Sequence, residues 1–225
     1  MRAIRAVPVC LSLIVLLATA TPSRAAATAW VARYDGPQHN TDAALGVAAA
    51  PDGGRVFVTG KVSSGGGRYI YTTLGYDAAT GDQLWATPYD NGYDIPYGIS
   101  VSPDSSKVFV TGGNATVAYD AATGAQLWVD VEGSFTGRSI AMSPDGTRTY
   151  VTGSFGTTYG IVTFAFDSAT GAQVWHANHQ GPYAQGRLVG TSPDGTRIFS
   201  VGLSYGRRAG GQQRLPHLTG REPER

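Results

Sequence analysis

The sequence predicts an all-β protein, a β-propeller of four-stranded antiparallel blades, and three observations support this fold class. A ten-residue phrase is written three times, as YDAATGDQLW at 76–85, YDAATGAQLW at 119–128 and FDSATGAQVW at 166–175. A second phrase occurs four times, as APDGGRVFVTG at 50–60, SPDSSKVFVTG at 102–112, SPDGTRTYVTG at 143–153 and SPDGTRIFSVG at 192–202. The tryptophans recur at spacings of 55, 43 and 47 residues, a period typical of repeated supersecondary units.

Each unit contains four strand signals, which the second unit shows well. Its β-branched and aromatic segments are separated by turn residues, in the order 98–101, 107–111, 115–119 and 125–129. No segment shows sustained helical periodicity. We therefore expect repeats over 28–206, with three complete blades and a partial one, in a truncated or incomplete ring. The expected blades are 45–90, 97–131, 138–180 and, in part, 187–206.

The thrice-written phrase is explained by the demands of a blade corner. Asp120 can accept backbone N–H bonds within its own turn, and Gly124 can adopt the positive φ that a tight turn needs. Trp128 supplies a large flat surface of the kind that fills gaps between layers. We interpret the phrase as architecture. Its residues are Asp77, Thr80, Gly81, Trp85, Asp120, Thr123, Gly124, Trp128, Asp167, Thr170, Gly171 and Trp175.

These residues resemble the tryptophan-docking motif of quinoprotein-like propellers. The pattern Ala-x-Asp-x-x-Thr-Gly-x-x-x-Trp is matched from Ala118 and from Ala165, and the first copy departs only at Gly75. The second phrase is similar to repeats of secreted bacterial propellers. The resemblance covers roughly residues 29–206 and implies the fold shared by pyrroloquinoline quinone (PQQ) dehydrogenases and many non-enzymatic relatives. It implies blades held together by the motif, without implying a quinone.

The ends of the repeat region are irregular. Residues 29–36 are predicted to be a fourth strand with no first three before it, and propellers commonly close with such a terminal strand. Residues 207–225 lack alternation and aromatic residues, and are predicted to be a disordered or aberrant tail. The tail can be native, the end of a truncated chain, or an out-of-frame translation, and its abrupt composition favours the last two. An open arc would expose apolar blade faces, which predicts self-association.

The first 27 residues are predicted to be a secretory signal peptide. A basic start is followed by an apolar run at 6–20 and by small residues, so cleavage is expected near Ala25 or Ala27. The run is too short to span a bilayer comfortably, and no second one follows. We therefore expect a secreted protein of bacterial type without a membrane span. The only cysteine, Cys10, would leave with the signal peptide, which excludes disulfides and thiolate sites from the mature chain.

Charge and composition restrict the classes of molecule that this protein is expected to bind. Residues 28–206 carry nine Arg and Lys against fourteen Asp and Glu, a net charge of −5, whereas 207–225 carry five Arg and two Glu. An acidic body without a basic stripe argues against nucleic acid. Tyrosines beside Gly, Pro and Asn in the connecting segments suit recognition of a protein, peptide or carbohydrate. The candidate ligand surface is Tyr93, Tyr97 and Tyr183, although tyrosines also fill propeller cores.

Catalytic and metal signals are weak. Quinone dehydrogenases need calcium, a catalytic aspartate and commonly a vicinal disulfide, and the corner aspartates here are accounted for by turns. His176 and His179 lack a third ligand, and the segment 90–94 lacks the full calcium-loop pattern. We predict no cofactor, no metal and no catalytic residue. The predicted function is a non-catalytic binding or scaffold module. The alternatives are a fragment of a propeller enzyme (a quinoprotein dehydrogenase, lyase or hydrolase) lacking its catalytic blades, and a non-functional truncated product.

Overall fold

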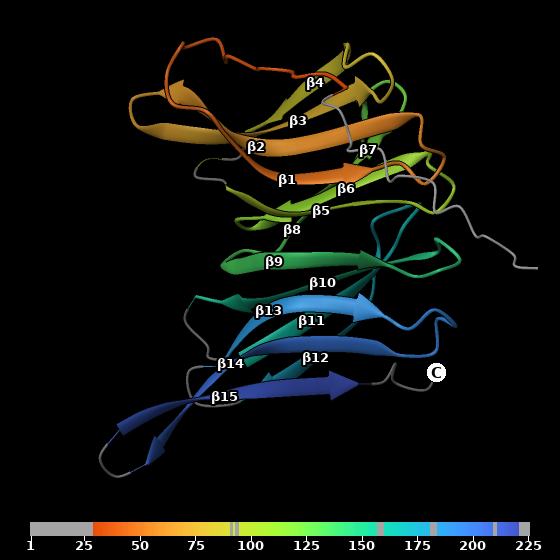
Figure 1. Ribbon diagram of the computed structural model, residues 1–225. Helices are drawn as coiled ribbons and strands as arrows, with labels where there is room; N and C mark the ends of the chain where they lie inside the picture. Colours follow the sequence, from red (N-terminus) through yellow and green to blue (C-terminus); the bar gives the residue numbers. More distant parts are fainter. Residues whose placement is uncertain are drawn as a thin grey trace, which may run out of the picture.

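Antiparallel strands stacked in four layers make up the computed structural model of the protein (Figure 1). The structure describes residues 29–90, 92, 95–156, 160–180, 184–208 and 211–220, and from residue 204 onward the backbone alone. The predicted signal peptide and Cys10 lie outside the described residues. Among the residues described, all regular elements are strands, as the sequence predicts. No membrane-crossing helix is found in this part of the chain.

The layers follow the sequence repeats, and we call them the first to fourth blades. The first blade contains β1 (Ala43–Ala49), β2 (Arg55–Gly65), β3 (Arg68–Asp77) and β4 (Gln83–Tyr89). The second contains β5 (Pro96–Val101), β6 (Lys107–Gly112), β7 (Ala115–Asp120) and β8 (Gln126–Val131). The third contains β9 (Phe135–Met142), β10 (Arg148–Phe155), β11 (Gly160–Asp167) and β12 (Gln173–Gln180). The fourth contains β13 (Gln185–Thr191), β14 (Ile198–Arg208) and β15 (Gly211–Gly220).

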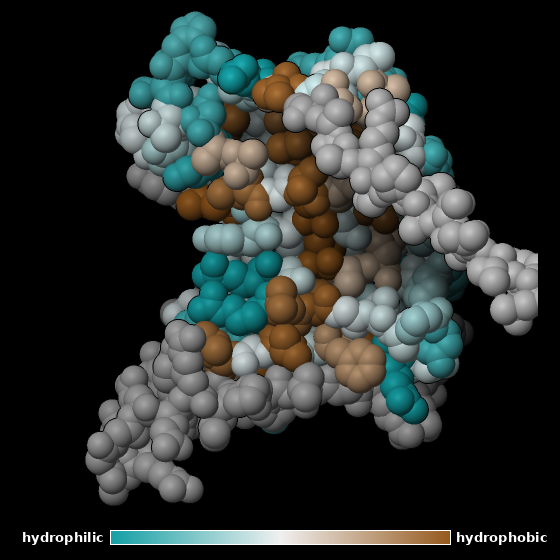
Figure 2. Space-filling view, in the orientation of Figure 1, coloured by the Kyte–Doolittle hydropathy of each residue, from teal (hydrophilic) through white to brown (hydrophobic). Residues whose placement is uncertain are grey.

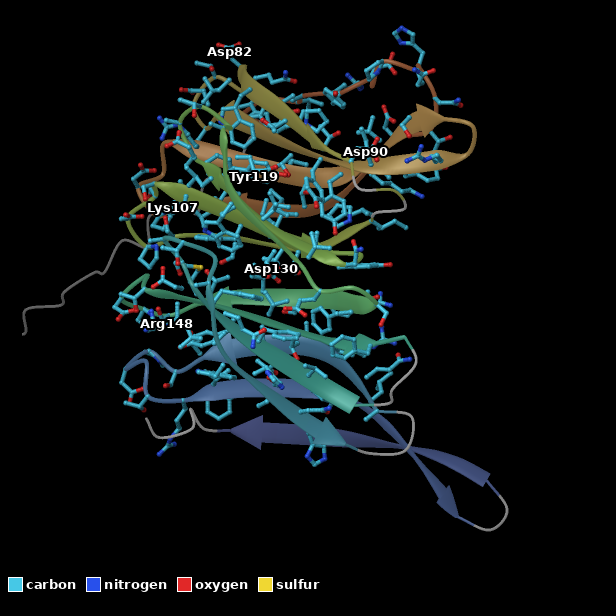
Figure 3. The ribbon with its side chains drawn as sticks, turned by 180° about the vertical axis from the view of Figure 1, so that it is seen from behind. Asp82, Asp90, Lys107, Tyr119, Asp130 and Arg148 are labelled. Carbon is cyan, nitrogen blue, oxygen red and sulfur yellow. The ribbon has the colours of Figure 1, made fainter. Side chains whose placement is uncertain are left out.

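Each blade is an antiparallel meander in which consecutive strands pair. The third and fourth blades are joined by a single parallel pair, Gly160 with Gln185, so that together they count as one seven-stranded sheet. The first strand of each blade lies beside the first strand of the next, and we call β1, β5, β9 and β13 the inner strands. Figures 1 and 3 show the first and fourth blades at opposite ends of the stack, so the described blades form an open arc.

The cores lie between the blades. Phe57 and Tyr71 of the first blade share one cluster with Val108 and Tyr119 of the second (Figure 3 labels Tyr119). Phe109 of the second blade likewise packs with residues of the third. Strand side chains alternate between the two faces of a sheet, and the second and third blades are covered on both faces. A middle blade is therefore apolar on both sides, which explains runs such as VFV.

Two terminal segments differ from the sequence prediction. Residues 207–208 extend β14, and β15 pairs with it along ten residue pairs, from Phe199 with Gly220 to Arg208 with Gly211. We predicted a disordered or aberrant tail there because the side chains do not alternate, but a ladder needs only backbone N–H and C=O groups. Residues 29–36, predicted to be a strand, lie against the first blade without strand pairing. Residues 221–225 lie outside the described part.

Candidate functional site

The repeated corner is a self-contained hydrogen-bonded turn. Asp120 Oδ1 accepts hydrogen bonds from the backbone N–H of Ala122 (3.0 Å) and from the backbone N–H and hydroxyl of Thr123 (both 2.8 Å). Gly124 closes the turn with a φ of +73°, in the region that glycine adopts without strain. Asp77 and Asp167 make the same turn with Thr80 and Thr170. Hydrogen bonds from these threonines lower the pKa of Asp77, Asp120 and Asp167, so all three are ionised turn residues at neutral pH.

The tryptophans dock on these corners, one blade further along. The Trp85 indole N–H donates to the carbonyl of Ala121 (3.1 Å), and the Trp128 N–H donates to the carbonyl of Ser168 (3.1 Å). Both side chains are buried at blade boundaries. Trp175 packs on Tyr150 of its own blade, with ring centroids 6.0 Å apart. Each indole therefore lies at a different boundary, and the three do not converge on a common cavity.

The second repeated phrase, SPDG and its variants, also forms a turn, and its aspartate accepts hydrogen bonds within that turn. Ser102 Oγ and Ser106 Oγ donate to Asp104, and these hydrogen bonds lower the pKa of Asp104 to about 2. The corresponding Ser192 and Thr196 lower the pKa of Asp194 to about 2. A polar hollow of about 240 Å³ lies between the last two such turns. Its carboxylates already accept hydrogen bonds inside their own turns, so it has no free acid or base group.

The described residues do not fit a calcium–quinone site. No group of three His, Cys, Asp or Glu side chains that could hold a metal ion occurs in the described ranges. The corner aspartates belong to three separate turns. His176 contacts the ring of Phe164 and the amide of Gln173, and Asp90 faces Arg68 at 3.4 Å. These contacts are those of surface residues.

The inner strands place four equivalent side chains in a row. They come six residues before the proline of each turn, and they are Leu45, Tyr97, Arg138 and Arg187. Leu45 is 45% exposed and Tyr97 is 39% exposed, unusual values for large apolar side chains of a repeat core. The guanidinium of Arg138 lies 4.2 Å from the centroid of the Tyr97 ring, within the range of a cation–π contact.

A hollow of about 290 Å³ opens beside Tyr97. Leu45, Ile95 and Pro96 form its apolar wall, and Lys61 supplies a cationic group. The described residues that line it include no acidic side chain. We call Leu45, Lys61, Tyr97, Arg138 and Arg187 the inner-strand site. It combines an apolar floor with three cations on a body whose net charge is negative.

Beside this site, an apolar stripe crosses the inner strands (Figure 2). The four residues that come four positions before the same prolines are all apolar: Val47, Ile99, Ile140 and Val189. A Cβ at Gly46 would lie 3.0 Å from Ile99, and one at Gly98 would lie 3.2 Å from Ile140. The glycines thus let β1 approach β5 closely, and β5 approach β9.

The candidate ligand surface predicted from sequence is described at one of its three positions. Tyr97 lies on β5 and lines the hollow, whereas Tyr93 and Tyr183 lie outside the described residues. Sequence reasoning missed Leu45, Lys61, Arg138 and Arg187. Aligning the repeats on their prolines would have found three of them, since Leu45, Arg138 and Arg187 share the position of Tyr97. Lys61 lies on β2 and carries no such signal.

One carboxyl group at a blade boundary has an unusual environment. Asp130 lies two residues after Trp128 on β8, and therefore on the face of that strand that meets the third blade (Figure 3). Burial, with a smaller contribution from Glu132, raises the pKa of Asp130 to about 6. The folded state thus holds this proton more tightly than the unfolded chain does. The contribution of Asp130 to the free energy of unfolding is fully present below the pKa that this carboxyl group has in the unfolded chain. It is lost as the pH rises through about 6, the pKa in the folded state.

We therefore expect Asp130→Asn to stabilise the protein at pH 8 and to change little at pH 4. The expected gain at pH 8 is about 1 kcal/mol, which allows for solvent screening of a half-buried group. Denaturant unfolding at both pH values measures it. Asp82→Asn, on an exposed corner, serves as the control. An equal effect of Asp130→Asn at the two pH values would contradict the assignment.

Stacked four-stranded blades, docked through a tryptophan and a corner turn, define a β-propeller protein of the PQQ-like repeat type. Residues 71–212, more than half of the 225 residues, match the family described as "Outer membrane protein assembly factor BamB". The chain belongs to this family. None of the curated proteins matches the chain.

Two solved structures have the same fold. Hydrazine synthase of Kuenenia stuttgartiensis matches with a TM-score of 0.57 and 20% identity, over 78% of this chain and 45% of that chain. The β-propeller domain of Cps50 (Swd1) from Myceliophteria thermophila matches with a TM-score of 0.55 and 11% identity, over 73% of this chain and 52% of that one. The chain thus spans about half the length of these structures. At such identities the likeness shows the fold alone.

Proposed function

We propose that this chain is an exported propeller module that binds a polypeptide partner at the inner-strand site and acts as a scaffold without catalysis. The observation that carries the proposal is the pairing of Tyr97 with Arg138 above a hollow lined by Leu45 and Lys61. The export rests on the basic, apolar and small-residue pattern of residues 1–27. The family description, which concerns assembly of outer membrane proteins, supports a polypeptide as the ligand.

The chemistry of the site favours an acidic segment with an apolar side chain. A half-exposed tyrosine and a leucine offer broad contact at low entropic cost. Arg138 is held by the Tyr97 ring, so its N–H groups are pre-positioned for a carboxylate. Arg187 donates only to its neighbour Gln185 among the described contacts, at 3.2 Å, and is exposed to solvent. An extended peptide crossing the inner strands would meet the tyrosine and both arginines in succession.

Selection from a displayed library of random peptides tests this function. Peptides retained by the wild-type protein are expected to be rich in Asp, Glu and large apolar residues. Tyr97→Ala and Arg138→Gln should each weaken their binding about tenfold or more, the usual loss at an anchoring aromatic or arginine. Isothermal titration with a selected peptide measures this loss.

Leu127→Ala is the matched control, since Leu127 is 45% exposed on β8, away from the inner strands. Peptides that bind the Tyr97 and Arg138 variants as tightly as the wild type would overturn the assignment of the site. Salt dependence gives a second readout. Binding through the arginines should weaken as ionic strength rises, whereas binding through the apolar stripe alone should not.

A further inference from the structure

The internal blade boundaries share one pattern of contacts. At the first boundary, Phe57 and Trp85 of the first blade pack with Tyr119 of the second; the ring centroids of Trp85 are 5.7 Å from Phe57 and 6.4 Å from Tyr119. At the second boundary, Trp128 takes the same place, 5.8 Å from Phe109 and 6.3 Å from Phe166. Each of these two boundaries therefore joins an inserting pair, one Phe and one Trp, to a receiving face on the next blade; at the third boundary Tyr150 and Trp175 form the pair.

The inserting aromatic residue is exposed at the end of the fourth blade. It comes six residues after the proline of each repeat, and the series is Phe57, Phe109, Tyr150 and Phe199. The first three are at most 2% exposed, whereas Phe199 is 41% exposed. Its neighbour Ile198 is buried against the third blade, so Phe199 points away from the stack. Among the described residues of the fourth blade, none supplies an indole beside Phe199.

The opposite defect occurs at the first blade. Its receiving face consists of Val58, Leu74 and Tyr76, which stand where Val110, Val117 and Tyr119 stand in the second blade. Trp30 is already docked there, because its indole N–H donates to the carbonyl of Ala78 (2.9 Å) and its ring lies 6.1 Å from that of Tyr76. This arrangement repeats the docking of Trp85 and Trp128.

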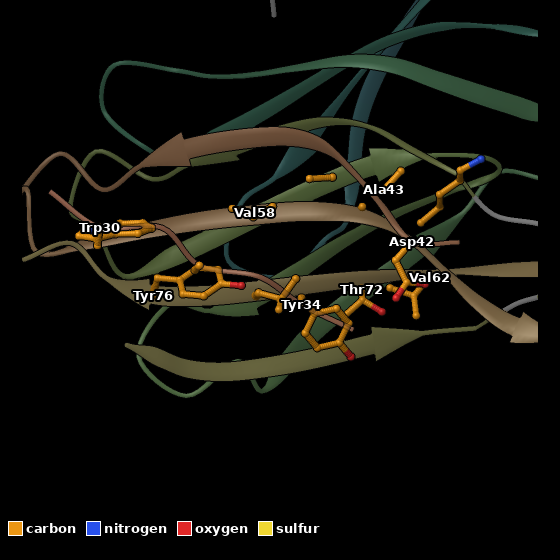
Figure 4. A pocket seen from close by; sticks show the side chains of 13 residues that line it. Trp30, Tyr34, Asp42, Ala43, Val58, Val62, Thr72 and Tyr76 are labelled. Atoms are coloured by element: carbon orange, nitrogen blue, oxygen red, sulfur yellow. The ribbon is translucent and has the colours of Figure 1, made fainter. Parts of the chain in front are cut away.

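A cavity remains beside Trp30. It measures about 240 Å³ and is bounded by Trp30 and Tyr34 on one side and by Val58, Leu74 and Tyr76 on the other (Figure 4). No inserting Phe fills it from within the described chain. The first blade thus has the indole and the receiving face but lacks the second aromatic residue. The described part of the fourth blade has that residue without an indole beside it.

We propose that a second copy of this chain joins the two defects, with Phe199 of one copy entering the cavity beside Trp30 of the next. The first and fourth blades lie at opposite ends of the stack in both views, so one copy does not join its own ends (Figures 1 and 3). The contact is head-to-tail, and two copies that exchange it twice close a ring. Residues 30–36 pair with no strand of the first blade. In the dimer, their backbone would lie along the free edge of β15 of the other copy and act as the fourth strand of that blade, as β4 does beside β3 in the first blade.

The physical gain is the burial of complementary apolar surface. Covering the exposed Phe199 side chain removes its apolar surface from water, and closing the cavity restores contacts that Trp30, Leu74 and Tyr76 lack on one side. Pairing residues 30–36 with β15 also removes an exposed strand edge. Neither Phe199 nor Trp30 belongs to the inner-strand site, which shares only Lys61 with the cavity.

Sedimentation velocity on the full chain tests the association. The wild-type protein is expected to sediment as a dimer that dissociates on dilution. Phe199→Asp and Trp30→Ala should each weaken the dimer at least tenfold and give monomers with unchanged far-UV circular dichroism. Leu127→Asp, which changes an equally exposed apolar residue on β8, should behave as the wild type does.

Mixing the two variants gives the sharpest result. A Phe199→Asp copy keeps an intact receiving end and a Trp30→Ala copy keeps an intact inserting end, so one head-to-tail contact remains. The mixture should form a one-to-one complex that neither variant forms alone. A monomeric wild type, a dimer that survives both substitutions, or a mixture that stays monomeric would overturn the proposal. The first of these outcomes would assign the cavity to a different polypeptide.

Discussion

Replacing Trp128 by alanine is expected to lower the free energy of unfolding by about 3–5 kcal/mol, as removal of a buried aromatic side chain does. The ring fills the boundary between the second and third blades, against Phe109 and Phe166. Its N–H is the hydrogen-bond donor to Ser168, whose carbonyl is buried with it. The substitution therefore leaves both a cavity and an unsatisfied acceptor. Urea unfolding followed by far-UV circular dichroism, whose signal comes from the backbone, measures this change in the free energy of unfolding.

Two variants show whether docking itself is responsible. Leu127→Ala removes an exposed side chain next to Trp128 on the same strand and should cost less than about 0.5 kcal/mol. Trp128→Phe keeps an aromatic ring without the N–H. Its loss of free energy of unfolding should lie between those of Leu127→Ala and Trp128→Ala. A Trp128→Ala protein as stable as Leu127→Ala would mean that the indole does not hold the blades together.

Replacing Gly124 by alanine is expected to cost about 2–5 kcal/mol, a large effect for the addition of one methyl group. Two terms contribute. The φ of +73° is disfavoured for a residue with a Cβ by about 1–2 kcal/mol. The new Cβ would also lie 2.6 Å from the Trp85 ring and 2.8 Å from Thr87 Oγ1, so the docked indole must shift, and such overpacking costs about 1–3 kcal/mol.

Gly53→Ala separates these two terms. Gly53 has the same φ, +73°, and a Cβ there would meet nothing within 4 Å. It should therefore cost only the conformational term, about 1–2 kcal/mol. Denaturant unfolding of the two variants gives the docking term as their difference. Equal losses for Gly53→Ala and Gly124→Ala would show that the corner does not press against Trp85.

Local chemistry explains why the blades could be predicted. The corner at Asp120 is closed by hydrogen bonds that reach no further along the chain than Ala125, so the residues that specify it are neighbours in the chain. The alternating segments between such corners can form only strands. Sequence alone was less informative at the ends. β15 pairs through its backbone, without a side-chain pattern, and residues 29–36 have strand-like side chains but pair with no strand.

The amino-acid sequence by itself determined the fold class, the repeat and the architectural role of the thrice-written phrase, because each depends on residues close in the chain. Tertiary structure alone decided which side chains meet across blades. Tyr97 and Arg138 are 41 residues apart, and they touch because consecutive inner strands lie side by side with equivalent positions in register. The exposure of Phe199 and the cavity beside Trp30 were likewise decided by the stacking of the blades, since burial depends on the neighbours that packing supplies.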